Sequence, residues 1–421
     1  MQGTLGLVLA VAGVLFLSWL FLVTLFTPAV HYRVNEPVNV ASAEFLLALQ
    51  STAPSPLYEG NRIEVLRNGD CFYPAMLHEI RRAQRSICLE CYIFEDGEYG
   101  RQFVAALAER ARAGIVVMVT VDALGRIGIH PAKLDELREA GGRIHYYQRV
   151  RWYSLQRLNN RTHRELLVVD GEVAFVGGAG IADRWAMRTS TPQWRDTVVR
   201  VRGPMVTGVQ GVLAANWLES GGEILTGADF FRPLEPVGDA RGFVVRSSSA
   251  HRTTASRVLF QLLIESASRT LFINTPYFLP DAPLRKALIR VASNGVSVTV
   301  LVPGPRTDQR WVRTVSRRYF GQLLEAGVRI FEYQPSMIHS KVLVVDDLWA
   351  VVGTTNVDNR SFEHNDEVNA VVRDPSLATQ LWEQGQQDIE KSVEITLADW
   401  RARPYWERLL GTGDWLFERQ Q

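Results

Sequence analysis

The sequence predicts an α/β protein in which two duplicated α/β sandwich lobes follow an N-terminal transmembrane helix. Three observations support this prediction. Segments with the periodicity of strands and helices alternate along the chain, and residues 5–26 are apolar without a charged side chain. In addition, the order of segments recurs after about 180 residues, which is too long for a solenoid unit and indicates a duplicated domain.

The first lobe is expected to begin near Asn61. Its helices are predicted from apolar positions at helical spacing, and its strands from short β-branched runs. In chain order we expect a helix over residues 70–85, a strand over 87–94, a helix over 101–113, a strand over 115–122, and a short helix over 134–140 that ends at Gly141 and Gly142.

The second lobe repeats this order. We expect a helix over residues 251–267, a strand over 271–278, a helix over 282–293, a strand over 296–302, a helix over 319–326 that ends at Gly327, and a strand over 342–345. Local phrases repeat as well, since EAGGRI at 139–144 is matched by EAGVRI at 325–330.

Composition shifts predict where these parts begin and end. Residues 28–60 contain four prolines and few regular apolar periods, and a Gly- and Pro-containing segment separates the lobes. The aromatic residues near the C-terminus fit two interpretations equally well, a helix that lies in a membrane interface and packing on the second lobe. The predicted parts are a transmembrane anchor (1–27), a juxtamembrane tether (28–60), a first lobe (61–222), a linker (223–242), a second lobe (243–390) and a Trp-rich C-terminal tail (391–421).

The apolar run at residues 5–26 is long enough to cross a hydrocarbon core of roughly 30 Å. A cleaved signal peptide is the competing interpretation. It is disfavoured because no Lys or Arg precedes the run, and because the run is longer than the apolar region of a usual signal peptide. We therefore expect a single-pass anchor in the cell (inner) membrane, with the side of the catalytic domain left open.

Composition restricts the class of partner. The chain has 421 residues and a formal net charge of +1, whereas proteins that wrap nucleic acid usually show a strong basic excess. Nucleic acid is therefore not an expected partner. Cys71, Cys88 and Cys91 are too few for a disulfide scaffold, and Cys88 and Cys91 fall on opposite faces of a predicted strand. We expect Cys88 and Cys91 to lie in the core and to form no metal site.

A candidate catalytic motif lies before the predicted strand at 342–345. His339 and Lys341 are two residues apart and project to the same face of an extended backbone. An imidazole can attack phosphorus or donate a proton, and an ammonium can hold the anionic oxygens. His-x-Lys is common in surface strands, so this motif alone indicates little.

A second copy of the motif changes this interpretation. His163 is followed by Asp170 and by Gly177 and Gly178, at the spacing with which His339 is followed by Asp346 and by Gly353 and Thr354. Each copy is then followed by a further acid, Asp196 or Glu367. Coincidence of these spacings with the surrounding repeat is improbable.

The second copy, which continues from Thr354 to Asn356, resembles the HKD signature of the phospholipase D superfamily. Its flanks are similar to those of bacterial cardiolipin synthases, including LLEAGVRIFEY at 323–333 and, in the first lobe, WRDTVVRVRGP at 194–204. The resemblance extends over both predicted lobes.

The resemblance implies a bilobal fold in which both motifs meet at the lobe interface and form one phosphodiester site. One histidine attacks phosphorus to give a phosphohistidine, and the other protonates the leaving alcohol and then activates the incoming one. Asp196 and Glu367 are expected to hold the imidazoles in the required tautomer. The implied catalytic residues are His163, His339, Lys341, Asp170, Asp346, Asp196 and Glu367, and the implied substrate-binding residues are Gly353, Thr354, Asn356, Gly177 and Gly178; no metal or cofactor is expected.

The chain departs from the family pattern at Glu165, where a lysine is expected, and at Gly180, where an asparagine is usual. A unit charge about 4 Å from a phosphate is worth roughly 4 kcal/mol at an effective dielectric constant near 20, so this change turns attraction into repulsion. A nearby cation must compensate, or Glu165 must be neutralised or turned away. The candidate cations, which also fit a solvated basic loop, are Arg149, Arg151, Arg157, Arg161 and Arg164.

The expected function is that of a membrane-anchored phosphatidyltransferase that makes cardiolipin from phospholipid donors, with phospholipid and membrane as partners. A second hypothesis is hydrolysis of a phosphodiester, in which water replaces the alcohol acceptor. A third is a lipid-binding protein whose first half-site is degenerate at Glu165. The two histidines and the second motif argue against the third hypothesis.

Overall fold

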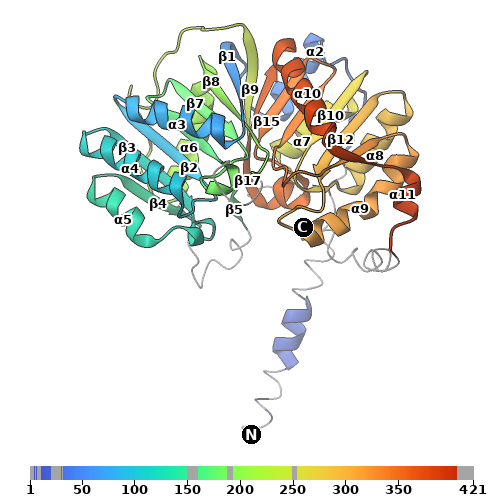
Figure 1. The fold of residues 1–421 in the computed structure, drawn as a ribbon, viewed down its shortest axis with the longest axis horizontal. Helices are drawn as coiled ribbons and strands as arrows, with labels where there is room; N and C mark the ends of the chain where they lie inside the picture. Colours follow the sequence, from blue (N-terminus) through green and yellow to red (C-terminus); the bar gives the residue numbers. More distant parts are fainter. Residues whose placement is uncertain are drawn as a thin grey trace.

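The computed structural model of the chain describes residues 4, 6, 11–19, 30, 32–148, 160–186, 193–248 and 254–404, and it contains two α/β lobes that lie side by side (Figure 1). The predicted α/β class and the two-lobed arrangement are therefore confirmed. Each lobe has a central sheet with helices on both faces, as expected where strands and helices alternate along a chain.

The first lobe is built on a mixed sheet. Strands β2, β3 and β4 are parallel neighbours, and β6, β7 and β8 continue the sheet in antiparallel fashion from β2. Its elements are β1 (Tyr58–Arg67), α3 (Gly69–Arg82), β2 (Ser86–Cys91), α4 (Glu98–Arg112), β3 (Val116–Asp122), α5 (Pro131–Glu139), β4 (Arg143–Tyr147), β5 (Arg161–Thr162), β6 (Leu166–Val169), β7 (Val173–Gly177), β8 (Thr197–Arg202) and α6 (Met205–Glu219), with short 3-10 turns at Gly125–Gly128 and Asp183–Trp185.

The second lobe repeats this plan. Strands β10, β12 and β13 are parallel, and β14, β15 and β17 extend the sheet in antiparallel fashion from β10. Its elements are β9 (Ala240–Ser247), α7 (Ala255–Glu265), β10 (Thr270–Asn274), β11 (Phe278–Leu279), α8 (Ala282–Ser293), β12 (Ser297–Pro303), α9 (Arg310–Glu325), β13 (Arg329–Tyr333), β14 (Val342–Val345), β15 (Trp349–Gly353), β16 (Val357–Asp358), a π-helical turn at Arg360–His364, β17 (Asn365–Arg373) and α10 (Pro375–Ile389).

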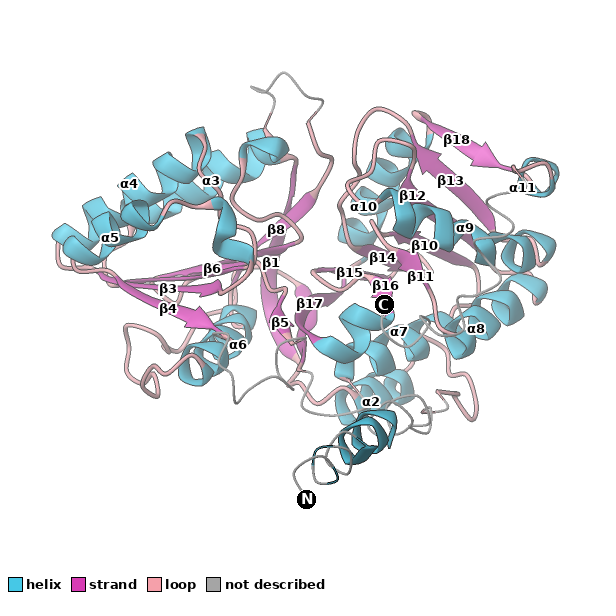
Figure 2. Ribbon diagram, turned by 90° about the horizontal axis from the view of Figure 1, so that it is seen from below, coloured by secondary structure: helices cyan, strands magenta, loops and turns pink. Residues whose placement is uncertain are grey.

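Helices cover both faces of each sheet (Figure 2). In the first lobe α3, α4 and α5 lie on one face and α6 lies on the other. Cys88 is buried toward the α6 face and Cys91 toward the opposite face. The core position expected for these two cysteines is therefore confirmed, and both thiols are free.

The sheets of the two lobes join into one continuous sheet through β1 and β9. β1 pairs with β8 of the first lobe, and β9 pairs with β17 of the second, while β1 and β9 pair with each other. Both strands begin inside segments that were predicted to be a tether and a linker, at Tyr58 and Ala240. The shared sheet fixes one lobe against the other.

Several predicted elements differ from the structure by a few residues at an end, and two differ more. The strand expected over 271–278 is divided into β10 and β11, because β11 leaves the main sheet to pair with β16. Helix α9 begins at Arg310, well before the expected residue 319. Val312, Ser316 and Phe320 are buried at helical spacing from the first turn on, and Arg313 and Arg317 both form ion pairs with the buried Glu332 of β13. The earlier start is therefore visible in the apolar pattern, and the ion pairs add a tertiary contact.

Part of the predicted tether is a packed helix, α2 (Ala43–Thr52). Ser42 accepts a hydrogen bond from the Phe45 amide and caps the helix. Phe45 and Leu49 are fully buried in the core of the second lobe, and the indole of Trp349 donates to the Val40 carbonyl oxygen at 2.8 Å. This stretch therefore belongs to the second lobe rather than to a free tether.

The start of the predicted tail also packs on the second lobe. Strand β18 (Ser392–Ile395) adds to the edge of β13, and α11 (Leu397–Arg401) follows it. The Trp400 indole donates to the Arg317 carbonyl oxygen at 2.6 Å. For Trp400, packing on the lobe is the alternative that the structure supports. The remaining aromatic residues of the tail lie in 405–421, outside the described residues.

Most of the predicted anchor at 5–26 also lies outside the described residues. Residues 11–19 are helical, with exposed apolar side chains that include Leu15, Phe16 and Trp19. Within the described part of the chain, no helix has both the length and the apolar character needed to cross a bilayer.

Candidate active site

The two motif histidines lie where the lobes meet, and each is attached to the other lobe through its backbone. The His163 amide donates to the Asp366 carbonyl oxygen of β17 at 2.9 Å, beside the short pairing of β5 with β17. The His339 amide donates to the Arg195 carbonyl oxygen just before β8 at 2.7 Å. Each histidine thus lies beside the segment of the other lobe that carries an acid, Glu367 or Asp196.

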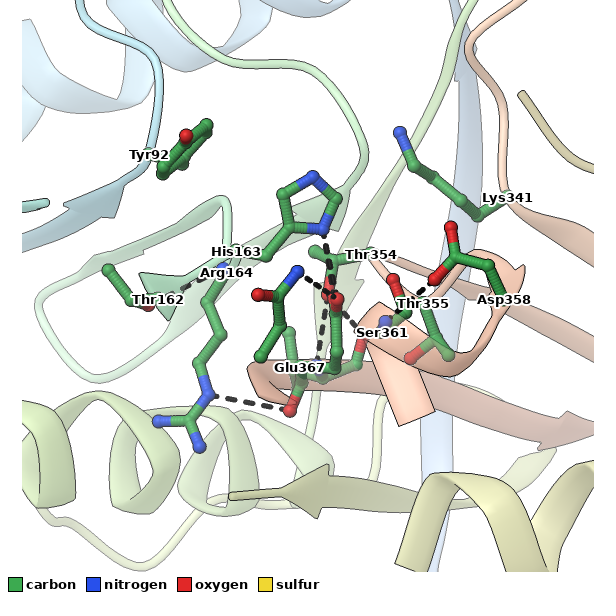
Figure 3. Close-up of polar contacts among 12 residues, drawn as sticks. Tyr92, Thr162, His163, Arg164, Lys341, Thr354, Thr355, Asp358, Ser361 and Glu367 are labelled. Carbon is green, nitrogen blue, oxygen red and sulfur yellow. Dashed lines mark hydrogen bonds and ion pairs between the residues drawn. The ribbon is translucent and has the colours of Figure 1, made fainter. Parts of the chain in front are cut away.

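The first crossed pair joins His163 to Glu367. The Nδ1 atom of His163 lies 3.0 and 3.1 Å from the two carboxylate oxygens of Glu367 (Figure 3). Glu367 is fully buried, and it also accepts hydrogen bonds from the Thr354 hydroxyl and, at 3.4 Å, from the Asn365 side-chain amide. A carboxylate at Nδ1 places the proton there and leaves Nε2 for chemistry.

The second crossed pair joins His339 to Asp196. The Nδ1 atom of His339 is 2.9 Å from Asp196 Oδ2, which also accepts the indole N–H of Trp185 at 2.9 Å. The Thr197 amide donates to the other carboxylate oxygen at 2.8 Å. The rings of Trp185 and Trp194 lie 5.5 and 5.4 Å from the imidazole and shield it from water.

Lys341 contacts the second histidine directly. Its Nζ lies 2.8 Å from Nδ1 and 3.1 Å from Nε2 of His339, and donates to the His339 carbonyl oxygen at 2.9 Å. The side chain passes over Gly178 of the first lobe, where a Cβ atom would lie 2.8 Å from both Cδ and Nζ. A glycine at position 178 therefore makes room for the lysine of the other lobe.

Burial determines the charge of this cluster. Burial lowers the pKa of His339 to about 4, with Lys341 acting in the same direction and Asp196 opposing it. Burial also lowers the pKa of Lys341, although the acids around it oppose this effect. Burial alone would raise the pKa of Asp196, but the hydrogen bond and charge of His339, together with Lys341, lower it overall. At neutral pH the resting pair is thus a neutral imidazole and a carboxylate.

Comparisons with known proteins agree with this geometry. Residues 76–192 and 261–389 match the family described as "Cardiolipin synthase, PLD-like domain", and these ranges include both histidines. The chain belongs to this PLD-like family.

Relatives at the sequence level match most of the chain. Cardiolipin synthase of Alkalihalophilus pseudofirmus is 34% identical over 85% of this chain and 71% of its own length. Major cardiolipin synthase ClsA of Bacillus subtilis is 33% identical over 90% of this chain and 79% of its own length. Phosphatidylserine synthase of Haemophilus influenzae Rd KW20 has a similar fold, with a TM-score of 0.66 and 14% identity over 90% of this chain and 98% of its own length.

The aspartates of the two PLD-like motifs lie away from the histidines, contrary to their expected catalytic role. Each directly follows the strand that its histidine precedes, so that the histidine and the aspartate are on the order of 20 Å apart along an extended chain. Asp170 accepts hydrogen bonds from the amides of Gln84, Arg85 and Ser86. Asp346 binds the amides of residues 268–270 in the same way. Both carboxylates thus hold the turn before a parallel strand.

The two predicted glycines Gly177 and Gly353 end strands β7 and β15. A Cβ atom at Gly177 would lie 2.7 Å from the Thr197 carbonyl oxygen of β8, and one at Gly353 would overlap the Val368 carbonyl oxygen of β17. Gly177 therefore lets β7 approach β8, which directly follows Asp196. Gly353 likewise lets β15 approach β17, which contains Glu367. Asn356 is buried, and its Oδ1 has no hydrogen-bond partner among the described residues.

Of the arginines expected to replace the missing lysine, the two that the structure describes do not point into the site. Arg164 is buried and turns away from His163, donating to the carbonyl oxygens of Ser247 at 3.0 Å and Glu367 at 3.4 Å (Figure 3). Arg161 forms a buried ion pair with Asp122 at 3.4 Å. Both support the strands behind the site. Arg149, Arg151 and Arg157 lie outside the described residues.

The Glu165 side chain is directed at the backbone of the first lobe rather than at a phosphate site. It is buried, and its Oε1 accepts the amides of Tyr92 and Ile93 at 3.2 Å each. Burial raises the pKa of Glu165 well above its usual range, although these amides and Lys341 oppose the shift. Its orientation toward these amides, and a raised pKa that favours the neutral carboxyl, both reduce the repulsion expected from this residue.

One buried acid near the site received no role from sequence reasoning. Asp358 accepts the Ser361 amide at 2.7 Å, and burial raises its pKa to about 6 (Figure 3). Its place within the HKD-like segment was visible in the sequence, but no spacing distinguished it from a surface residue. Among the described residues, no group of three or more His, Cys, Asp or Glu side chains is arranged to hold a metal ion.

Proposed function

We propose that this chain is a membrane-anchored phosphatidyltransferase that makes cardiolipin through a phosphohistidine intermediate. The observation that carries the proposal is the crossed arrangement of His163 with Glu367 and His339 with Asp196. Two histidines, each oriented by a carboxylate of the other lobe, are what a two-step displacement at one phosphorus requires.

In the first step, the neutral imidazole of one histidine attacks phosphorus. The N–P bond forms, the P–O bond to the leaving alcohol breaks, and the other histidine, in its protonated form, gives its proton to the departing oxygen. In the second step this histidine, now neutral, takes the proton of the incoming alcohol. The new O–P bond forms as the N–P bond breaks, and the first imidazole is regenerated.

Lys341 supplies positive charge for this reaction. In the resting site its ammonium contacts His339, and a substrate phosphate that approaches the imidazole would take over that contact. The side-chain amide of Asn356, in the same segment, is the second donor that we assign to the phosphate. Both come from the second lobe, so the two lobes contribute unequally to phosphate binding.

The choice of a phospholipid substrate rests on the relatives and on the N-terminus. Proteins named cardiolipin synthase match 85–90% of this chain. The apolar stretch at 5–26 would hold the site at a bilayer, where both donor and acceptor lipids lie, and its described part, residues 11–19, is helical with exposed apolar side chains. The acceptor is then the headgroup hydroxyl of a second phospholipid.

The test uses the full chain, purified in detergent and supplied with vesicles of phosphatidylglycerol. We expect cardiolipin and glycerol as products, detected by mass spectrometry. His163→Ala and His339→Ala should each abolish both products, whereas His78→Ala, a change at an exposed surface histidine, should not. Phosphatidic acid as the only new lipid would instead establish the hydrolase. Equal product from the wild-type protein and His339→Ala would refute the proposal.

A further inference from the structure

The two departures from the PLD-like pattern occupy equivalent positions in the duplication. Glu165 corresponds to Lys341, and Gly180 corresponds to Asn356, at the same interval along the chain that relates His163 to His339. The first lobe therefore lacks both of the phosphate-binding side chains that we assign to the second lobe. Two losses at once suggest that the pair has acquired another role.

The two residues are in contact with each other and with one stretch of backbone. A Cβ atom at Gly180 would lie 3.0 Å from Glu165 Oε1 and 2.7 Å from both the Cβ and the carbonyl oxygen of Ile93. An asparagine at position 180 would therefore displace the Glu165 carboxyl. With glycine there, Oε1 accepts the amides of both Tyr92 and Ile93.

The second lobe cannot make the same contact. The β-bridge between Phe94 and Ile181 in the first lobe corresponds to the pairing of Phe278 with Val357 in the second. Two residues before Phe94 and Phe278, Tyr92 therefore corresponds to Pro276. A proline has no amide proton to donate. The acceptor at position 165 and the donor at position 92 are thus both specific to the first lobe.

The backbone that Glu165 holds leads directly to a catalytic histidine. The ring of Tyr92 lies edge-on to the imidazole of His163, with 5.8 Å between the ring centroids. We infer that Glu165 is a positioning residue that acts through Tyr92: its carboxyl, in the space left by Gly180, fixes the Tyr92–Ile93 backbone and thereby sets the Tyr92 ring against His163.

The charge state of Glu165 follows from its surroundings. The titratable groups around it are Lys341, Asp196, Tyr92, Cys91 and Tyr73, and of these only Lys341 favours the carboxylate. Burial outweighs Lys341 and the two amides, and raises the pKa of Glu165. The raised pKa favours the uncharged carboxyl, whose hydrogen-bond acceptor glutamine can reproduce and lysine cannot.

The inference rests on the proposed function only in that a phosphoryl group occupies the site. Its test therefore measures lipid turnover, whichever product forms, together with binding of inorganic phosphate to the full chain by calorimetry. If the wild-type protein makes no cardiolipin, the proposed function fails, whereas the phosphate titrations still test Glu165. Thermal denaturation of each variant shows that it is folded.

We expect Glu165→Gln to keep turnover within about threefold of the wild type at pH 7, because its side-chain oxygen accepts the same two amides. Glu165→Ala should be about tenfold slower, because it leaves both buried amides without their acceptor and frees the Tyr92 ring. Glu165→Lys should be at least as slow, since it loses the acceptor and buries a cation. Tyr92→Ala should match Glu165→Ala, while Tyr92→Phe, which keeps the ring, should not.

The dependence on pH separates positioning from simple structural support. As pH rises, wild-type Glu165 ionises near Lys341 and offsets part of the positive charge that binds phosphate. Phosphate affinity should therefore fall more steeply in the wild type than in Glu165→Gln, with Lys341 titrating in both. Three results would overturn the inference: Glu165→Lys as fast as the wild type or faster, Glu165→Gln as slow as Glu165→Ala, or pH profiles of the wild type and Glu165→Gln that coincide throughout.

Discussion

Replacing Asp196 by asparagine tests the crossed pairing with the least change of shape. The Asp196 carboxylate accepts three hydrogen bonds, from His339 Nδ1, the Trp185 indole and the Thr197 amide. An asparagine has one acceptor oxygen and a nitrogen that can only donate. If the nitrogen takes the place of Oδ1, the Thr197 amide faces an N–H group, and if it takes the place of Oδ2, both His339 and the Trp185 indole do. In the second case the imidazole changes tautomer or turns away.

The size of the effect follows from two estimates. A full charge about 3 Å from an imidazolium is worth roughly 5 kcal/mol at an effective dielectric constant near 20, which is an upper bound. Hydrogen bonds to charged groups are worth about 1.5–3 kcal/mol by substitution, and this range applies here because Lys341 and the neighbouring donors remain. The expected loss in kcat is therefore about 10- to 150-fold, with the protein still folded.

The assay is cardiolipin formation from phosphatidylglycerol vesicles, normalised to the folded fraction. Asp170→Asn is the matched control, because Asp170 is also an aspartate of the motif region but binds only backbone amides in the described structure. It should lower the melting temperature and leave kcat of the folded protein within about twofold of the wild type. An Asp196→Asn protein that is folded and equally close to the wild-type kcat would refute the reasoning.

Three further outcomes follow from the same contacts. Lys341→Ala should lower kcat by about 10²- to 10³-fold, the usual cost of removing one donor to developing negative charge, and substantial residual turnover would contradict the unequal roles of the two lobes. Asp346→Asn should destabilise the protein by about 1–3 kcal/mol, because the amides of residues 268–270 lose a charged acceptor; chemical denaturation measures this. The folded pKa of His339, about 4, lies below its unfolded value of 6.5, so its contribution to stability is complete above pH 6.5 and is lost as pH falls toward 4. Folded His339→Gln should show a denaturation midpoint that falls less over this range.

The architecture could be read from the sequence because local patterns specified it. Helices α3, α4, α7 and α8 have apolar faces at regular spacing, and the duplicated order indicated two lobes. The start of α9 and the whole of α2 were missed. Helical spacing of Val312, Ser316 and Phe320 is present at the start of α9, whereas the burial of Phe45 and Leu49 of α2 depends on the core of the second lobe, which lies far along the chain.

The site was predicted in part. The two motif copies and their resemblance to the HKD signature predicted His163, His339, Lys341, Asp196 and Glu367 as site residues, and the structure places each histidine beside one of the two acids. Because the aspartates have the same spacing in both copies, catalytic roles were predicted for Asp170 and Asp346 as well. Both bind backbone amides at the far ends of their strands instead. A fixed interval in sequence reports a repeated fold element, and it does not separate residues that hold the fold from residues that face the substrate.

By itself, the sequence determined that the chain is a duplicated α/β protein with two histidine motifs and a departure at Glu165, because these properties are written in residue order and period. Only the tertiary structure decided that each histidine pairs with the acid of the other lobe, since that pairing arises where β5 meets β17 and where the segment before β8 meets His339. It also decided the state of Glu165. A carboxyl is charged or neutral according to what surrounds it, and the residues that follow β2, precede β8 and lie in the second motif reach Glu165 only through the fold.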